Sequence, residues 1–241
     1  MQDLLIDAGN TRLKLGLFHN KELVFKETMP YAEVATRLPG ILNMHLVKSI
    51  FICDVSGKLE ALLPALNLEL PITFLTEQTI LPFHNLYQSA TLGSDRKALV
   101  AGAMAIYLQR NCLVIDAGTC VTYDILTHAH EFLGGNITPG LQMRLQAMHT
   151  FTGKLPLLEW QETAELMGNT TQACMQSGTY YGLIGEINYF VEVYQQMHPG
   201  LMVILTGGDA HVLAKSIKTS IFVNEDLLLH GLNKIVNHHA E

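Results

Sequence analysis

Two short stretches of the sequence carry the residue types of a phosphate-binding turn. In the first, apolar residues 4–6 are followed by Asp7, Gly9, Asn10 and Thr11, and leucines then alternate with other residues from position 13 to position 17. This order predicts a buried strand, a tight hairpin and a return strand. A carboxylate at the end of a strand can hold a divalent cation, and turn amides suit phosphate oxygens. An ordinary Asn/Gly hairpin would explain the same residues.

The second stretch repeats the first about half a chain later. Apolar residues 113–115 lead into Asp116, Gly118 and Thr119, and an alternating return strand follows. Two matched copies predict two related lobes, residues 1–110 and residues 111–241. The repetition favours a nucleotide site built from two turns over a coincidence of hairpins, although Asp116 could still be an ordinary turn residue at a strand end.

A third group of chemically capable residues lies between the two copies. Gly93, Ser94, Asp95 and Arg96 open a segment whose apolar residues recur with helical spacing up to residue 109. A carboxylate in this place can accept a proton in catalysis or can cap the helix. A guanidinium binds carboxylate or phosphate oxygens well, and it can also be a solvated charge of the first turn.

Composition excludes several classes of protein. Of the 241 residues, 49% are hydrophobic and 15% are charged, which is typical of a globular chain, and the net charge is −7. No cluster of Lys and Arg exceeds a pair, which argues against binding nucleic acid or an anionic membrane. No apolar run approaches about 18 residues and no secretion signal is evident, so a cytoplasmic protein is expected.

The absence of several motifs narrows the chemistry. Neither the GxxxxGK[ST] nor the GxGxxG pattern occurs, which excludes the usual P-loop and Rossmann sites. There is no CxxC or HExxH spacing for zinc. The sequence predicts buried, reduced thiols for the four widely separated cysteines, which are Cys53, Cys112, Cys120 and Cys174.

The second half of the chain supplies elements that would position these residues. Residues 141–150 and 170–197 show helical patterns, and the longer one carries Gly178, Gly182 and Gly185, a spacing that indicates close helix packing. The strand predicted over residues 201–205 ends at Thr206-Gly207-Gly208, where a base or ribose could lie against the backbone. A closing amphipathic helix is expected over residues 225–236.

Taken in order, these motifs resemble type III pantothenate kinase over nearly the whole chain. The resemblance rests on Asp7-x-Gly9-Asn10-Thr11-x-x-Lys14, Gly93-x-Asp95-Arg96, Asp116-x-Gly118-Thr119-x-x-Thr122, Gly134-Gly135-x-Ile137-x-Pro139-Gly140, Asn169-x-Thr171 with Gly178, and Thr206-Gly207-Gly208. It implies an α/β fold of two ribonuclease-H-like, actin-like ATPase lobes with mixed sheets flanked by helices. It also implies phosphorylation of pantothenate to 4'-phosphopantothenate with ATP, as the first step of coenzyme A synthesis in a homodimer.

The resemblance also implies a role for each matching residue. Asp95 would be the general base. Asp116 would bind a monovalent cation, K⁺ or NH₄⁺, and Asp7 would lie near Mg²⁺. ATP contacts are implied for Asp7, Ala8, Gly9, Asn10, Thr11, Arg12, Leu13, Lys14 and Thr119. Substrate contacts are implied for Tyr87, Gly93, Ser94, Asp95, Arg96 and Thr171.

Other interpretations stay open at this point. Lys14 could be an outward strand residue, and Tyr87 and Thr171 could serve in packing or capping. The segment between Tyr87 and Gly93 lacks the family's usual proline and is one residue shorter. A non-catalytic nucleotide-binding regulator on the same fold is the main alternative function. An ATP-driven protein of the actin or chaperone type is a third, for which 241 residues leave little room.

Overall fold

The computed structural model of the chain describes residues 2–89, 91–162 and 165–238, which form two compact units. Unit 1 comprises the described residues of 1–108, 129–132 and 226–241, and unit 2 those of 109–128 and 133–225. The sequence-based boundary near residue 110 assigned the C-terminal helix α7 (Leu227–His238) to the second lobe. In the structure, α7 packs against helix α3 (Ser94–Ile106) and clusters with unit 1.

Unit 1 is built on a five-stranded mixed sheet with the order β3-β2-β1-β4-β5. The central strand β1 pairs antiparallel with β2 and parallel with β4. The strands are β1 (Gln2–Ala8), β2 (Arg12–His19), β3 (Glu22–Pro30), β4 (Val47–Asp54) and β5 (Ile72–Phe74).

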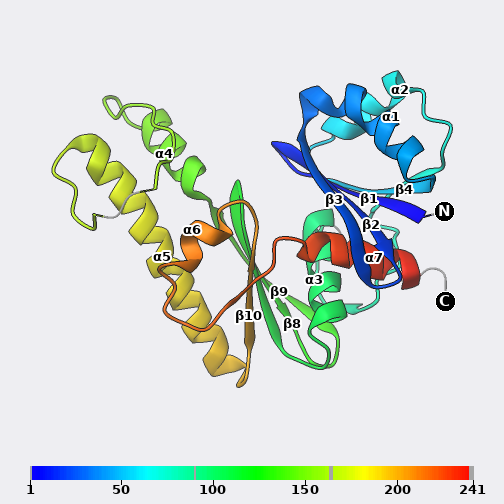
Figure 1. The fold of residues 1–241 in the computed structure, drawn as a ribbon. Helices are drawn as coiled ribbons and strands as arrows, with labels where there is room; N and C mark the ends of the chain where they lie inside the picture. Colours follow the sequence, from blue (N-terminus) through cyan, green and yellow to red (C-terminus); the bar gives the residue numbers. More distant parts are fainter. Residues whose placement is uncertain (1, 90, 163–164, 239–241) are drawn as a thin grey trace. The chain divides into compact units, whose positions relative to one another are not determined.

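Helices cover both faces of this sheet. The 3₁₀ turn η1 (Tyr31–Glu33) leads into α1 (Val34–Met44), and α2 (Lys58–Leu66) follows β4. Leu4 and Ile6 of β1 pack in one core cluster with Leu38 of α1 and Leu59 of α2. Helices α3 and α7 contact β4 and β1, and Figure 1 shows them beside each other and away from α1 and α2. Unit 1 is therefore a sheet between two helical layers.

Helices α3 and α7 approach each other so closely that only glycine fits at their crossing. A Cβ atom built on Gly231 would lie 1.7 Å from the backbone oxygen of Ala98, and one on Gly102 would lie 2.1 Å from the backbone oxygen of Leu227. Backbone atoms cannot rotate away as a side chain can. This contact therefore fixes α3, which carries Asp95 in its first turn.

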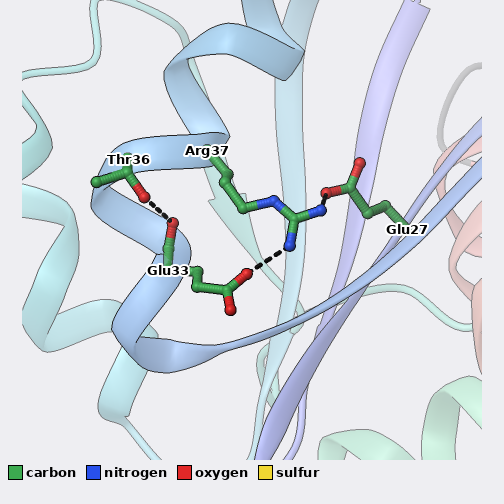
Figure 2. A network of polar contacts seen from close by, with 4 residues as sticks. All are labelled: Glu27, Glu33, Thr36 and Arg37. Carbon is green, nitrogen blue, oxygen red and sulfur yellow. Dashed lines mark hydrogen bonds and ion pairs between the residues drawn. The ribbon is translucent and has the colours of Figure 1, made fainter.

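A surface network ties α1 to the neighbouring strand β3. The Arg37 guanidinium donates to the carboxylates of Glu33 and Glu27, and the Thr36 hydroxyl donates to the Glu33 carbonyl at 2.9 Å (Figure 2). Arg37 is nearly half exposed, so these ion pairs contribute little to stability.

The second sheet has the order β11-β10-β7-β8-β9-β6. Its edge strand β6 and the first residues of β9 cluster with unit 1, and the other strands belong to unit 2. The strands are β6 (His84–Asn85), β7 (Cys112–Ala117), β8 (Cys120–Leu126), β9 (Glu131–Pro139), β10 (Met202–Thr206) and β11 (Phe222–Val223).

Three helices accompany the strands of unit 2. They are α4 (Leu141–Thr150), α5 (Thr171–Met197) and α6 (Ala210–Ala214). Ile115 and Tyr123 of the sheet pack in one core cluster with Leu183 of α5, Leu141 of α4 and Leu213 of α6. The helix expected over residues 141–150 is confirmed at both ends, and the long helix begins one residue later than expected.

The strand order shows the internal duplication directly. β7 pairs antiparallel with β8 and parallel with β10, as β1 does with β2 and β4. The series β9-β8-β7-β10-β11 therefore repeats the series β3-β2-β1-β4-β5. Each matched turn lies between the central strand and its antiparallel neighbour.

No helix among the described residues is long and apolar enough to cross a membrane. All four cysteines are free thiols. Cys53 and Cys112 are buried and Cys120 is half-buried, but Cys174 is exposed on α5, so the expectation of buried thiols is wrong for Cys174.

Candidate active site

The turn between β1 and β2 presents the expected phosphate-binding residues to solvent. Gly9 donates its amide to the Arg12 carbonyl at 3.1 Å, which closes the hairpin. Asn10, Thr11 and Arg12 are exposed at its tip. Asp7 and Lys14 pair across the two strands, so the positive charge of Lys14 lies close to the Asp7 carboxylate at the base of the turn.

Two residues that sequence reasoning missed hold this turn in place. The Tyr31 hydroxyl donates to the Gly9 carbonyl at 2.6 Å and also contacts the Ser56 hydroxyl at 3.1 Å. The Lys58 ammonium donates to the Asn10 carbonyl at 2.6 Å and lies 5.4 Å from the Tyr31 ring centre. Both residues are distant in sequence from the turn, and no local pattern marks them.

Asp7 and Asp95 lie close enough to influence each other. Burial raises the pKa of Asp7 from 3.8 to about 6, Lys14 opposes this rise, and the nearby Asp95 carboxylate adds to it. The strand end and the start of α3 thus bring two carboxylates together. A divalent cation or a proton between them would relieve the repulsion.

The raised pKa of Asp7 leads to a prediction about stability. Because the folded-state pKa lies above the unfolded value, ionised Asp7 destabilises the fold above pH 6, and this cost disappears as the pH falls below about 4. Asp7→Asn is therefore expected to raise the free energy of unfolding at pH 8 by up to about 3 kcal/mol, with no gain at pH 4. Urea unfolding at the two pH values measures this, and equal stability at pH 8 would contradict it. The same variant should lose activity.

The Asp95 side chain does not cap α3 in the usual way. Gly93 occupies the N-cap position, and Asp95 Oδ1 accepts the next backbone N–H, that of Arg96, at 2.8 Å. A Cβ atom on Gly93 would lie 2.5 Å from Asp95 Oδ1, so glycine leaves room for the carboxylate. The first-turn amides of α3 also favour negative charge here.

Cys53 supports the start of α3, which sequence reasoning also missed. Its thiol lies 3.4 Å from the Ser94 hydroxyl, and it pairs with Asp7 across β4 and β1. Burial and the neighbouring Asp7 raise the pKa of Cys53 well above its ordinary value, so it stays a neutral thiol. It packs beside the carboxylates and adds no charge.

Arg96 is buried against aromatic rings and is not the solvated charge of the alternative interpretation. The residue is 5% exposed, and its guanidinium carbon lies 5.2 Å from the ring centre of Tyr87 and 5.7 Å from that of Phe132. The rings of Tyr87 and Phe132 are 6.0 Å apart. A guanidinium packed against two neighbouring aromatic rings is pre-organised to bind an anion. The structure thus brings Tyr87 and Arg96 together and adds Phe132.

In unit 2, Asp116 lies between two threonines on neighbouring strands. It pairs with Thr122 of β8 and with Thr206 of β10. The Thr122 hydroxyl oxygen is buried and has no hydrogen-bond partner among the residues that the structure describes. Gly207 follows at a φ of +93°, where a Cβ atom would lie 2.4 Å from Asp116 Oδ1. Only glycine suits that position.

The turn that bears Thr119 is packed against the start of α4. Gly118 donates its amide to the Cys120 carbonyl at 2.9 Å, and Thr119 is exposed at the tip. Gly140 donates its amide to the Thr119 carbonyl at 3.0 Å. The second turn is therefore one residue shorter than the first and is held through its backbone.

Thr171 is exposed at the start of α5 and does not cap it. The cap is Thr170, whose hydroxyl accepts the Ala173 amide at 3.1 Å. Gly178, Gly182 and Gly185 do not pack against another described helix, because a Cβ atom on any of them would meet no described atom within 4 Å. Thr171 and the three glycines are exposed along α5.

Comparison with known proteins gives the family. A family model described as type III pantothenate kinase matches residues 3–193. A type III pantothenate kinase of Flavobacterium psychrophilum is 37% identical over 234 residues, which cover 96% of this chain and 97% of the relative.

Two solved structures resemble the whole chain. A conserved Campylobacter jejuni protein described as a Baf family transcriptional activator superposes with a TM-score of 0.61 at 23% identity, covering 98% of both chains. The activator of 2-hydroxyisocaproyl-CoA dehydratase from Clostridium difficile, solved with bound ADPNP, gives 0.54 at 13% identity, covering 99% of this chain and 94% of that one. These likenesses concern the fold alone. They confirm the expected actin-like α/β class with mixed sheets flanked by helices.

Proposed function

The chain belongs to the type III pantothenate kinase family, and on that premise we propose that it transfers the γ-phosphoryl group of ATP to pantothenate, forming 4'-phosphopantothenate and ADP. The observation that carries the proposal is the family match across the segments that hold Asp7, Asp95 and Asp116. The product makes this the first step of coenzyme A synthesis. The cytoplasm, where ATP is available, is the proposed location.

Asp95 is the proposed general base. Its carboxylate accepts the proton of the pantothenate hydroxyl as that oxygen attacks the γ-phosphorus, and the bond to the β-phosphate oxygen breaks to release ADP. The grouping of Tyr87, Arg96 and Phe132 near the start of α3 supports a substrate site in which Arg96 binds the substrate's carboxylate. Gly93 and Ser94, at the start of α3, are the other proposed substrate-binding residues of this site.

The β1–β2 turn is the proposed triphosphate site, from Asp7 to Lys14. Its exposed tip and the anchoring of its carbonyls by Tyr31 and Lys58 leave turn amides free to face phosphate oxygens. Kinases of this kind need a divalent cation, and Mg²⁺ is the proposed one, near Asp7. Among the described residues, no three His, Cys, Asp or Glu side chains form a metal cluster. Mg²⁺ in kinase sites is commonly held by one or two carboxylates together with phosphates and water. Thr119 is proposed to contact ATP from the second turn.

Asp116 is the proposed ligand of a monovalent cation, K⁺ or NH₄⁺. The surroundings suit such an ion, because hydroxyl and carboxylate oxygens are hard ligands. The buried hydroxyl of Thr122 lacks a hydrogen-bond partner within the described part of the chain and lies on the same face of the sheet as Asp116. A bound cation would satisfy that oxygen and offset the charge of Asp116.

A homodimer through α5 is the proposed assembly. Thr171, Cys174, Gly178, Gly182 and Gly185 recur at intervals of three or four residues and are all exposed, so they form one face of the helix. Glycines on such a face let a second helix approach closely, and Thr171 would then lie at the subunit boundary.

Gly182→Leu is expected to weaken this dimer. The leucine would project from the face where two backbones meet, whereas the chain itself leaves open space around it. Light scattering after size exclusion should show the wild type as a dimer and the variant shifted toward monomer at micromolar concentration. Gly40→Ala in α1, also in open space, is the control. A Gly182→Leu dimer as stable as that of the wild type would contradict the assignment.

The decisive experiment for the function is a coupled assay of ADP release. Turnover is expected only when ATP, Mg²⁺, pantothenate and either K⁺ or NH₄⁺ are all present, and mass spectrometry should detect 4'-phosphopantothenate. ATP binding without pantothenate-dependent turnover would instead support a nucleotide-binding regulator.

A further inference from the structure

Glu186 of α5 joins three separate elements of unit 2. Its Oε1 accepts the Tyr123 hydroxyl of β8 at 3.1 Å and the Thr138 hydroxyl of β9 at 2.6 Å. Its Oε2 accepts a guanidinium N–H of Arg144 in α4 at 2.6 Å. The side chains of Glu186 and Arg144 are about three-quarters buried, so solvent screens this ion pair less than a surface pair.

Arg144 also binds the backbone next to the second turn. Its Nε donates to the Pro139 carbonyl at 2.8 Å, while its terminal nitrogen remains on Glu186. The planar guanidinium makes both contacts at once, which a lysine ammonium cannot reproduce. Arg144 therefore fixes the junction of β9 and α4.

That junction presses directly on the turn that bears Thr119. Gly140, the residue after Pro139, donates its amide to the Thr119 carbonyl, and a Cβ atom on it would lie 2.1 Å from the Gly118 oxygen. Any shift of the junction would therefore shift the turn, because the contact is made by backbone atoms, which cannot rotate away.

We propose that Glu186 and Arg144 are positioning residues, which hold the Asp116–Thr119 turn in its nucleotide-binding and cation-binding geometry through Pro139 and Gly140. This proposal rests on the proposed roles of Asp116 and Thr119. Neither Glu186 nor Arg144 touches the nucleotide. Burial and the charge of Glu186 raise the pKa of Tyr123, whose hydroxyl donates to Glu186.

The test is the pair of variants Arg144→Lys and Glu186→Gln in the full chain. Each is expected to weaken the binding of a fluorescent ATP analogue by about 10-fold, as loss of a supporting residue around a ligand site commonly does. The K⁺ concentration for half-maximal activity should rise similarly, while the KM for pantothenate stays within about 2-fold. Arg37→Lys, an arginine in unit 1 that also pairs with glutamates, is the control and should change none of these.

A double variant separates positioning from general damage. If Glu186 and Arg144 act as one unit, Arg144→Lys with Glu186→Gln should weaken ATP-analogue binding little more than either change alone. ATP-analogue binding within 2-fold of the wild type in the single variants would overturn the inference. Equal rises in the KM for ATP and the KM for pantothenate would also overturn it. If the wild type binds the ATP analogue but does not turn over pantothenate, the proposed function fails while the binding titration still tests the positioning role.

Discussion

Replacing Asp95 with asparagine is expected to lower kcat by about 10²–10⁴-fold while leaving the affinities for ATP and pantothenate within a few-fold of wild type. An amide keeps the size and most hydrogen bonds of the carboxylate but cannot accept the hydroxyl proton. The Asp95 Oδ1 contact with the Arg96 amide is one that the asparagine oxygen can also make, so α3 should remain intact.

The measurement for Asp95→Asn is single-turnover ADP release together with binding titrations of each substrate. A loss of turnover without loss of binding identifies a residue that acts in the transition state. Loss of Asp95 also removes the charge that helps to raise the pKa of Asp7, so that pKa should fall in this variant. Retained turnover would exclude Asp95 as the base.

The second large effect is expected at the crossing of α3 and α7. Gly231→Ala would place a methyl carbon 1.7 Å from the Ala98 carbonyl oxygen, and only movement of a whole helix can relieve this contact. We expect a loss of about 3 kcal/mol or more in the free energy of unfolding. Because α3 carries Asp95 and Arg96, activity should fall even in the fraction that stays folded.

Urea unfolding of Gly231→Ala against Gly40→Ala tests this packing. Gly40 lies in α1 with nothing within 4 Å of its Cβ position, so alanine there is expected to stabilise by about 0.5–1 kcal/mol through helix propensity. Opposite signs for the two substitutions would show that the cost comes from the helix crossing. Equal effects would contradict the close contact of α3 with α7.

Local patterns were sufficient for much of the fold. Alternation of leucines from residue 13 and the apolar run at residues 113–115 correctly predicted the two hairpins, because strand burial repeats every second residue. The repeated Asp-x-Gly turns anticipated the duplicated strand order. The helix over residues 141–150 was recognisable from its first-turn signals and its spacing.

The position of α7 is a feature that local sequence patterns could not predict. The amphipathic spacing of α7 predicted a helix, yet nothing local says which sheet it covers. Its partner, α3, lies more than a hundred residues earlier in the chain. The contact requires glycine at both Gly102 and Gly231. A single sequence does not indicate that two glycines so far apart will be in contact.

The sequence by itself determined the two turns, the Asp95 motif and the family, because those depend on residue types at short spacing. Only the tertiary structure decided that Arg96 is buried against Tyr87 and Phe132, and that the glycines of α5 face open space. It alone showed Tyr31 and Lys58 bonded to the first turn, and Arg144 bonded to both Glu186 and the Pro139 carbonyl. These contacts join residues far apart along the chain, and their partners are set by how the sheets and helices pack.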